Sequence, residues 1–139
     1  MRLVIIGCGR IGAHIARSLA AEGCDVCVVD FDPASLGRLG RGFSGETVLG
    51  TGFDEAVLHK ARVADADAVA VLTNDDATNF IVARAVALLF GVRRVRVRVN
   101  DPEFAGLYAE LGVETVDLPD LVLGSVRGLL SPPAPRRSP

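Results

Sequence analysis

Short apolar runs alternate with amphipathic stretches from one end of the sequence to the other. The runs typical of strands cover residues 3–6, 26–29, 47–49, 68–72, 94–99 and 113–116. The first is apolar throughout and bounded by glycine, which is typical of a strand buried on both faces of a parallel sheet. In residues 94–99 arginine alternates strictly with valine, so that strand has an apolar face and a face that meets water or a ligand.

Helical patterns fall between these runs. They cover residues 10–21, 54–61, 77–90 and 120–130, together with a helix that opens at Asp101-Pro102 and ends at Gly112. In residues 10–21 apolar side chains recur every four residues, and Gly23 ends the pattern. Asp32-Pro33 predicts another helix start, but several glycines weaken the segment that follows. Residues 77–90 are nearly apolar all round, which predicts a deeply packed helix.

The order of these elements predicts the fold class. Strands that alternate with helices predict a parallel sheet with helices on both faces. Six strands in two mononucleotide-binding halves match a doubly wound, Rossmann-like α/β arrangement with strand order 3-2-1-4-5-6. The chain has 139 residues, 50% of them hydrophobic, so we expect one domain with a sizeable core. Residues 131–139 are rich in proline, which predicts a disordered tail or linker.

Charge and hydropathy exclude several classes of protein. The formal net charge is −2, which gives no reason to expect nucleic-acid binding. No apolar stretch approaches the roughly 18 residues that span a bilayer, so we expect no direct insertion into a membrane. The N-terminus lacks a signal-peptide cleavage pattern, and we expect a cytoplasmic protein.

Cys24 and Cys27 have the CxxC spacing of redox pairs and of half zinc sites. Residues three apart on a strand point to opposite faces, however, and the sequence offers no second pair of ligands. We therefore expect ordinary core cysteines and no metal site. His14 and His59 are expected on helix surfaces. Nothing resembles a catalytic triad or a paired-carboxylate site, so we assign no catalytic residue.

The glycine-rich segment GCGRIG, residues 7–12, lies between the first predicted strand and the first predicted helix. This GxGxxG spacing is that of the phosphate-binding turn of Rossmann folds. Gly7 allows the tight turn, Gly9 lets the backbone approach phosphates, and Gly12 lets the helix pack closely on the strand. The start of the helix offers free N–H groups and a positive dipole end to an anion.

Polar residues at the ends of the other strands complete a candidate site. Asp30 ends the second strand, where Rossmann folds place an acidic residue against the ribose hydroxyls. Its charge would repel a 2′-phosphate and no arginine follows immediately, so NAD(H), ATP or ADP are favoured over NADP(H). Thr51-Gly52 and Thr73-Asn74 follow the next strands and are candidates for adenine or ribose contacts. Arg98 either reaches a phosphate or is an ordinary exposed side chain.

Several separated motifs carry a family resemblance. They are GCGRIG at 7–12, VVDFD at 28–32, GTGFD at 50–54, TNDD at 73–76 with Asn79, and VRVNDPE at 97–103. In combination they resemble the nucleotide-binding domain of the Trk/Ktr potassium-uptake regulators, the RCK or KTN (TrkA-N) domain, over about residues 1–119. Thr51 stands where that family usually has an acidic residue. The family often carries a second, C-terminal domain, whereas here the proline-rich segment follows.

The resemblance implies a cytoplasmic regulatory subunit that is not an enzyme. Such domains form dimers and commonly octameric rings on the inner face of a membrane potassium transporter or channel, which they gate on binding NAD(H) or ATP/ADP. Residues 120–130 would be a crossover helix through which related domains pair. By motif position the nucleotide site would comprise Gly7, Cys8, Gly9, Arg10, Ile11, Asp30, Phe31, Thr51, Gly52, Phe53, Thr73, Asn74 and Arg98.

Within that site the resemblance implies a division of roles. Arg10, Ile11 and the first two glycines of the loop would face phosphates, Asp30 the ribose, Gly52 and Phe53 the adenine side, and Arg98 a phosphate. Two other hypotheses stay open. One is the cofactor-binding half of an NAD-dependent oxidoreductase, and the other is a free-standing nucleotide-binding protein with a different partner.

Overall fold

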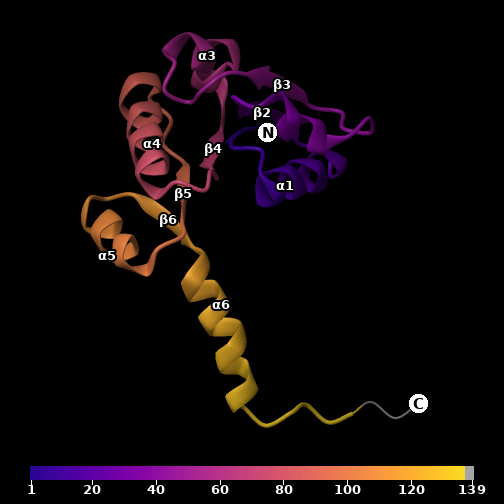
Figure 1. Cartoon of the computed structure of the whole chain (residues 1–139), viewed down its shortest axis with the longest axis vertical. Coiled ribbons are helices and arrows are strands. Elements are labelled where there is room, and N and C mark those ends of the chain that lie inside the picture. Colours follow the sequence, from indigo (N-terminus) through magenta and orange to yellow (C-terminus); the bar gives the residue numbers. More distant parts are fainter. Residues whose placement is uncertain (137–139) are drawn as a thin grey trace.

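A six-stranded parallel sheet organises the protein, whose computed structural model describes residues 1–136 (Figure 1). The strands are β1 (Arg2–Ile6), β2 (Asp25–Asp30), β3 (Glu46–Leu49), β4 (Ala68–Val71), β5 (Val95–Val99) and β6 (Glu114–Asp117). Every pairing is parallel, and the order is β3-β2-β1-β4-β5-β6. The predicted doubly wound, Rossmann-like topology is therefore confirmed.

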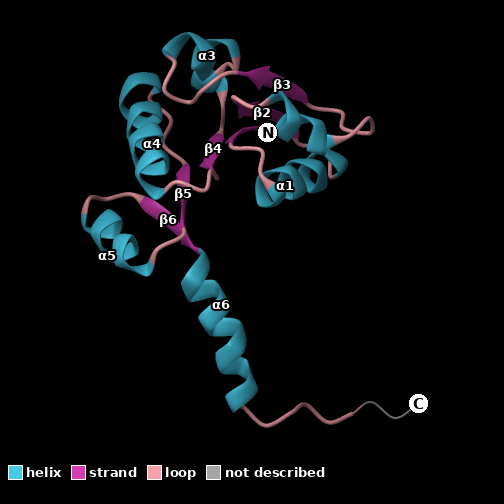
Figure 2. Ribbon diagram, viewed as in Figure 1, coloured by secondary structure: helices cyan, strands magenta, loops and turns pink. Residues whose placement is uncertain are grey.

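Helices connect the strands, and one more helix follows the last strand (Figure 2). They are α1 (Arg10–Ala21), α2 (Pro33–Leu36), α3 (Glu55–Lys60), α4 (Asp76–Phe90), α5 (Pro102–Glu110) and α6 (Leu118–Arg127), with short 3-10 turns at Gly37–Leu39 (η1), Val63–Asp65 (η2) and Gly128–Leu130 (η3). All these α-helices except α1 begin after an aspartate whose carboxylate accepts a backbone N–H of the first turn. The glycines after α2 limit that helix to a single turn, as expected.

The core has two layers because β1 and β2 are buried on both faces. Val4 and Cys27 point to the layer under α3 and α4, whereas Ile5 and Val28 point to the layer under α1. Cys24 packs against the second layer, so the two cysteines of the CxxC spacing lie on opposite faces of the sheet, as predicted.

Only one face of α4 is packed, so the prediction of a deeply buried helix is wrong. Val82, Ala83 and Val86 face the sheet and are buried. Ile81 and Leu88, which lie seven residues apart on the opposite face, are 51% and 69% exposed. A helix on an open sheet meets that sheet along one stripe. Packing against the described part of this chain therefore does not explain why the other stripe is apolar.

Helix α6 leads away from the sheet (Figure 1). None of its residues is buried, and Leu121, Val122 and Val126 are each more than half exposed. Residues 131–136 contain no helix or strand, and 137–139, the rest of the predicted tail, lie outside the described residues. Among residues 1–136 no helix has the length and apolarity needed to cross a bilayer.

Burial gives Cys27 a measurable effect on the pH dependence of folding. It raises the pKa of the Cys27 thiol to about 11, from an ordinary value of 9.0. The native state therefore holds this proton more tightly than the unfolded state, so the contribution to stability is complete below pH 9 and is lost as the pH rises towards 11. We expect the melting temperature of the wild type to fall more steeply over this range than that of Cys27→Ala, as measured by circular dichroism.

The matched control is Cys24→Ala, which removes a half-buried thiol and should retain the wild-type slope. Equal slopes for the wild type and Cys27→Ala would show that the Cys27 thiol does not contribute in this way.

Candidate functional site

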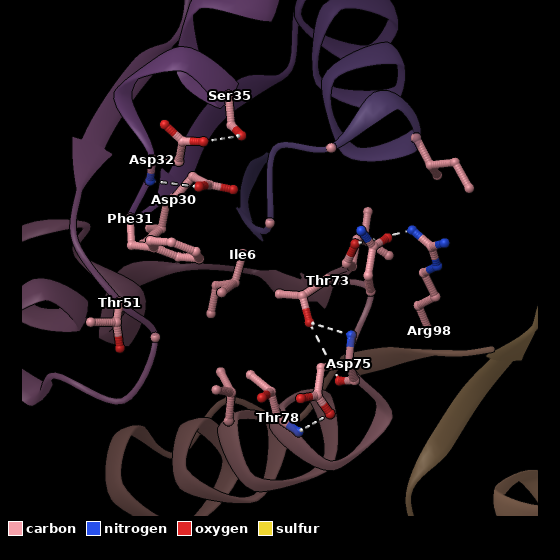
Figure 3. A pocket seen from close by; sticks show the side chains of 18 of the residues that line it. Ile6, Asp30, Phe31, Asp32, Ser35, Thr51, Thr73, Asp75, Thr78 and Arg98 are labelled. Atoms are coloured by element: carbon pink, nitrogen blue, oxygen red, sulfur yellow. Dashed lines mark hydrogen bonds between the residues drawn. The ribbon is translucent and has the colours of Figure 1, made fainter. Parts of the chain in front are cut away.

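A cavity of about 860 Å³ opens at the carboxyl ends of the strands. Its volume is in the range of pockets that hold small molecules and cofactors. Apart from Cys8, all the residues predicted for the nucleotide site line it: Gly7, Gly9, Arg10, Ile11, Asp30, Phe31, Thr51, Gly52, Phe53, Thr73, Asn74 and Arg98. Figure 3 shows Asp30 and Phe31 on one side of the cavity, with Thr73, Asp75 and Thr78 across from them.

The geometry of Gly7 and Gly12 is the one that their spacing predicts. Gly7 has φ +110°, and a Cβ there would lie 2.9 Å from the Leu72 carbonyl carbon. A Cβ on Gly12 would lie 2.0 Å from the Gly7 carbonyl oxygen, so only glycine allows α1 to approach β1 this closely. Gly9 has no atom within 4 Å of such a Cβ, which leaves its backbone open to the cavity.

Helix α1 begins without a side-chain cap. Its N-cap is Gly9, and its first turn contains no acidic residue. The first N–H groups of a helix have no partner within the helix, and together with the dipole they favour an anion. This uncapped start lies at the cavity, beside the exposed Arg10.

Asp30 joins the glycine loop to the turn after β2. Its Oδ2 accepts a hydrogen bond from the Cys8 backbone N–H at 2.7 Å, and its Oδ1 accepts one from the Asp32 N–H at 2.8 Å. A carboxylate has about four acceptor positions. The two that remain can accept ribose hydroxyls, because Asp30 also lines the cavity.

Cys8 is the predicted site residue that the structure does not bring to the cavity. Its side chain is fully buried among the residues packed under α1. Burial raises the pKa of the thiol, and the nearby charge of Asp30 raises it further. Cys8 thus acts on the site through its backbone N–H, whereas its thiol belongs to the core.

Two exposed aromatic rings line the cavity, and one of them, Phe53, was expected on the adenine side. Phe31 is 74% exposed and Phe53 is 60% exposed, and both line the cavity. The hydroxyl oxygen of Thr51 accepts a hydrogen bond from the Phe53 backbone N–H at 2.8 Å. A Cβ on Gly52 would lie 3.0 Å from Ile6 Cγ2, so a larger residue here would crowd the cavity wall.

Asn79 connects the ends of β4 and β5 beneath the cavity. Its side chain is fully buried, its Nδ2 donates to the backbone carbonyls of Thr73 and Arg98 at 2.9 and 3.0 Å, and its Oδ1 accepts from the Thr73 N–H at 3.1 Å. Oδ1 also accepts from the Thr73 hydroxyl, so both N–H donors and both acceptor positions of this buried amide are used. They fix Thr73 and Arg98, two predicted site residues from different strands, next to each other.

Several polar residues that line the cavity were missed by the sequence analysis. They are Asp32, Ser35, Arg38, Asp75 and Thr78. Asp75 and Thr78 lie one and four residues after the predicted Thr73-Asn74, and their position at the start of α4 could have identified them. Arg38 had no such signal, because it reaches the cavity only through the tight α2 and η1 turns, where an Arg17 guanidinium N–H donates to its carbonyl oxygen. Arg38 therefore lines the same cavity as Asp30.

Within residues 1–136 no group of three or more His, Cys, Asp or Glu side chains is placed to hold a metal ion. His14 and His59 are exposed on α1 and α3, as expected. The donors and acceptors of the cavity instead suit an organic anion with hydroxyl groups and a planar apolar part.

Comparisons with known proteins agree with this geometry. Residues 3–119 match the model of the TrkA-N domain family. The Trk system potassium uptake protein TrkA of Streptomyces coelicolor is 43% identical over 116 residues, which cover 84% of this chain and 52% of that protein. The protein of the same name from Vibrio alginolyticus is 31% identical over 104 residues, 75% of this chain and 23% of that protein. The chain thus spans about half or less of these relatives.

Solved structures show the same fold. The TrkA-N domain of the inner membrane protein ybaL from Escherichia coli superposes with a TM-score of 0.83 at 16% identity, covering 94% of this chain and 96% of that one. The structure of GsuK bound to ADP superposes with a TM-score of 0.75 at 26% identity, covering 93% of this chain and 33% of that one. From the match over residues 3–119 and the identity to TrkA, the chain belongs to the TrkA-N domain family.

Proposed function

We propose that this domain binds an adenine nucleotide, either NAD(H) or ATP/ADP, and that binding regulates potassium transport by a membrane partner. The observation that carries the proposal is the uncapped start of α1 at the cavity, with the carboxylate of Asp30 held beside it. The relatives named as Trk system potassium uptake proteins support the transport role. The ADP-bound structure of GsuK supports an adenine nucleotide as the ligand.

The cavity suggests how such a ligand lies. Its phosphates lie over Gly9 and the first turn of α1, where Arg10 adds a positive charge. Its ribose hydroxyls donate to Asp30, and its base lies against Phe31 and Phe53, since aromatic rings stack on bases. The β4–β5 side, with its polar wall, receives the remainder of the ligand, either further phosphate or the second half of a dinucleotide.

We infer a regulatory role rather than a catalytic one. The relatives are named as potassium uptake proteins, whereas the alternative of an oxidoreductase fragment draws its support from the fold alone. A regulatory ligand acts through its difference in affinity for two states of an assembly. On this proposal the domain works at the cytoplasmic side of the membrane, through its partner.

The exposed apolar surfaces support a homo-oligomer, with a dimer as its smallest form. Beyond α4, exposed large apolar side chains lie on α5 and its C-cap, on α6 and on η3: Phe104, Leu107, Leu111, Leu121, Val122, Leu123, Val126, Leu129 and Leu130. Apolar patches of this kind mark interaction sites. We propose that α6 pairs with its counterpart in a second copy, and that α4 and α5 extend the assembly, up to an octameric ring.

The glycine loop allows folding and binding to be tested separately. Gly9 has φ −73° and no neighbour within 4 Å of a Cβ, so Gly9→Ala should melt at the wild-type temperature. Its methyl group occupies the place of a phosphate, and we expect ATP or NADH affinity to fall at least about tenfold, equivalent to roughly 1.4 kcal/mol, in isothermal titration calorimetry.

Gly12→Ala is the contrasting variant. Its Cβ would lie 2.0 Å from the Gly7 carbonyl oxygen, so we expect a lower melting temperature together with weaker binding. Wild-type affinity in a folded Gly9→Ala protein would place the phosphates elsewhere.

Asp30 should set the preference among nucleotides. NADH, NAD, ATP, ADP and NADPH are titrated against the wild type and Asp30→Ala. We expect Asp30→Ala to bind the nucleotides with a free 2′-hydroxyl about ten- to a hundredfold more weakly, because hydrogen bonds to a charged group are lost. NADPH, which the carboxylate repels, should lose less. The control is Asp65→Ala, an exposed aspartate in η2 outside the cavity.

Two results would count against this role of Asp30: unchanged affinities in Asp30→Ala, or NADPH as the tightest ligand of the wild type. If no nucleotide binds the wild type at physiological concentration, the proposed function itself is wrong.

The pairing of α6 predicts a change in oligomeric state. Val122 and Val126 are 62% and 55% exposed and lie one helical turn apart. Replacing both with glutamate should convert the wild-type dimer or larger assembly to a monomer in size-exclusion chromatography with light scattering, because charge cannot be buried cheaply. Arg127→Glu, on another side of α6, is the control. A wild type that is already monomeric would refute the pairing.

A further inference from the structure

The guanidinium of Arg98 is held in place at the edge of the cavity. Its Nε donates to Asn100 Oδ1 at 2.7 Å, and its Nη1 approaches the Leu72 carbonyl oxygen at 3.4 Å. Guanidinium groups carry five N–H donors. The donors that remain are available to a ligand, and Arg98 lines the cavity across from Phe31 (Figure 3).

Asn100 cannot rotate its amide without losing other bonds. Its Nδ2 donates to Asp76 Oδ1 at 3.1 Å and to the Asn74 carbonyl oxygen at 3.2 Å. Both hydrogens of the amide nitrogen are therefore used, so Oδ1 must face Arg98. A flipped amide would direct N–H donors at the guanidinium, which has no acceptor.

Asp76 fixes Asn100 in turn. Its side chain is 8% exposed, and its carboxylate accepts from the backbone N–H groups of Asn100 at 2.7 Å and of Asp101 at 2.9 Å. Together with the amide of Asn100, these donors satisfy a buried carboxylate that makes no ion pair within residues 1–136. The negative charge of Asp76 and the positive charge of Arg98 thus lie at opposite ends of one oriented amide.

We propose that Asn100, held by Asp76, is a positioning residue that presents the Arg98 guanidinium to a phosphate group of the bound nucleotide. The inference rests on the proposed function. It adds which residue orients the guanidinium that would bind the phosphate. A free arginine loses side-chain entropy when it binds a ligand, whereas one already held loses less. Neither Asn100 nor Asp76 lines the cavity, so both act through Arg98.

A double-mutant cycle tests this coupling. The wild type, Asn100→Ala, Arg98→Ala and the double variant are titrated with ATP and with NADH, and their melting temperatures are recorded. We expect Asn100→Ala to weaken binding about tenfold in the wild-type background and to have no further effect once Arg98 is absent. An equal loss in both backgrounds would mean that Asn100 only supports the fold and would overturn the proposal, as would wild-type affinity in Asn100→Ala.

Arg98→Lys keeps the charge but lacks the planar Nε–H that Asn100 holds. We expect Arg98→Lys to lose about as much affinity for ATP and NADH as Asn100→Ala does. If Asn100→Ala melts too low to be titrated, Arg98→Lys takes its place in the test. Wild-type affinity in Arg98→Lys would overturn the proposal. Arg96→Ala is the control, since Arg96 is exposed on the same strand and pairs with Glu114 at 3.4 Å.

The wild-type titration separates the two levels of inference. If the wild type binds neither ATP nor NADH, the proposed function fails and the role of Asn100 fails with it. If the wild type binds and the cycle shows no coupling, the proposed function stands and this inference alone is overturned.

Discussion

The approach of α1 to the Gly7 carbonyl is the constraint on which the candidate site depends. A single Cβ on Gly12 would lie 2.0 Å from that oxygen, so the helix can start directly above the loop only because position 12 has no side chain. The positive φ of Gly7 turns the chain out of β1 at the same point. These two features direct the uncapped end of α1, with its free N–H groups, at the cavity.

Aspartates organise the remainder of that edge of the sheet. Those at positions 32, 54, 75, 101 and 117 cap helices, which uses their charge within the fold. Asp30 and Asp76 instead bind backbone N–H groups of neighbouring loops, one on each side of the cavity. Asp76 also lies close to α5, because the Tyr108 hydroxyl donates to its backbone carbonyl at 3.0 Å. Arg98 is therefore linked through Asn100 and Asp76 to a helix whose outer face is apolar and exposed.

Local patterns, together with the family resemblance, were sufficient to predict the strand order, most of the helix starts and about half of the cavity lining, because glycine spacing and Asp-Pro caps act over a few residues. Properties that depend on tertiary packing were not predictable. The Cys8 thiol turns into the core, and Arg38 returns to the cavity through two tight turns. Helix α4 is apolar on a face that no described residue covers, so its composition was misread as burial within the chain. On our proposal such a face packs against another copy of the chain.

The central claim is that the glycine loop and the start of α1 bind the phosphates of an adenine nucleotide. Backbone amide resonances report this contact directly, in a titration of the ¹⁵N-labelled protein with ATP or NADH followed by NMR. We expect the amides of Gly9, Arg10 and Ile11 to shift as the nucleotide saturates the protein, since they would donate to its phosphates. Saturation with shifts confined to other parts of the chain, or no binding at all, would contradict the account.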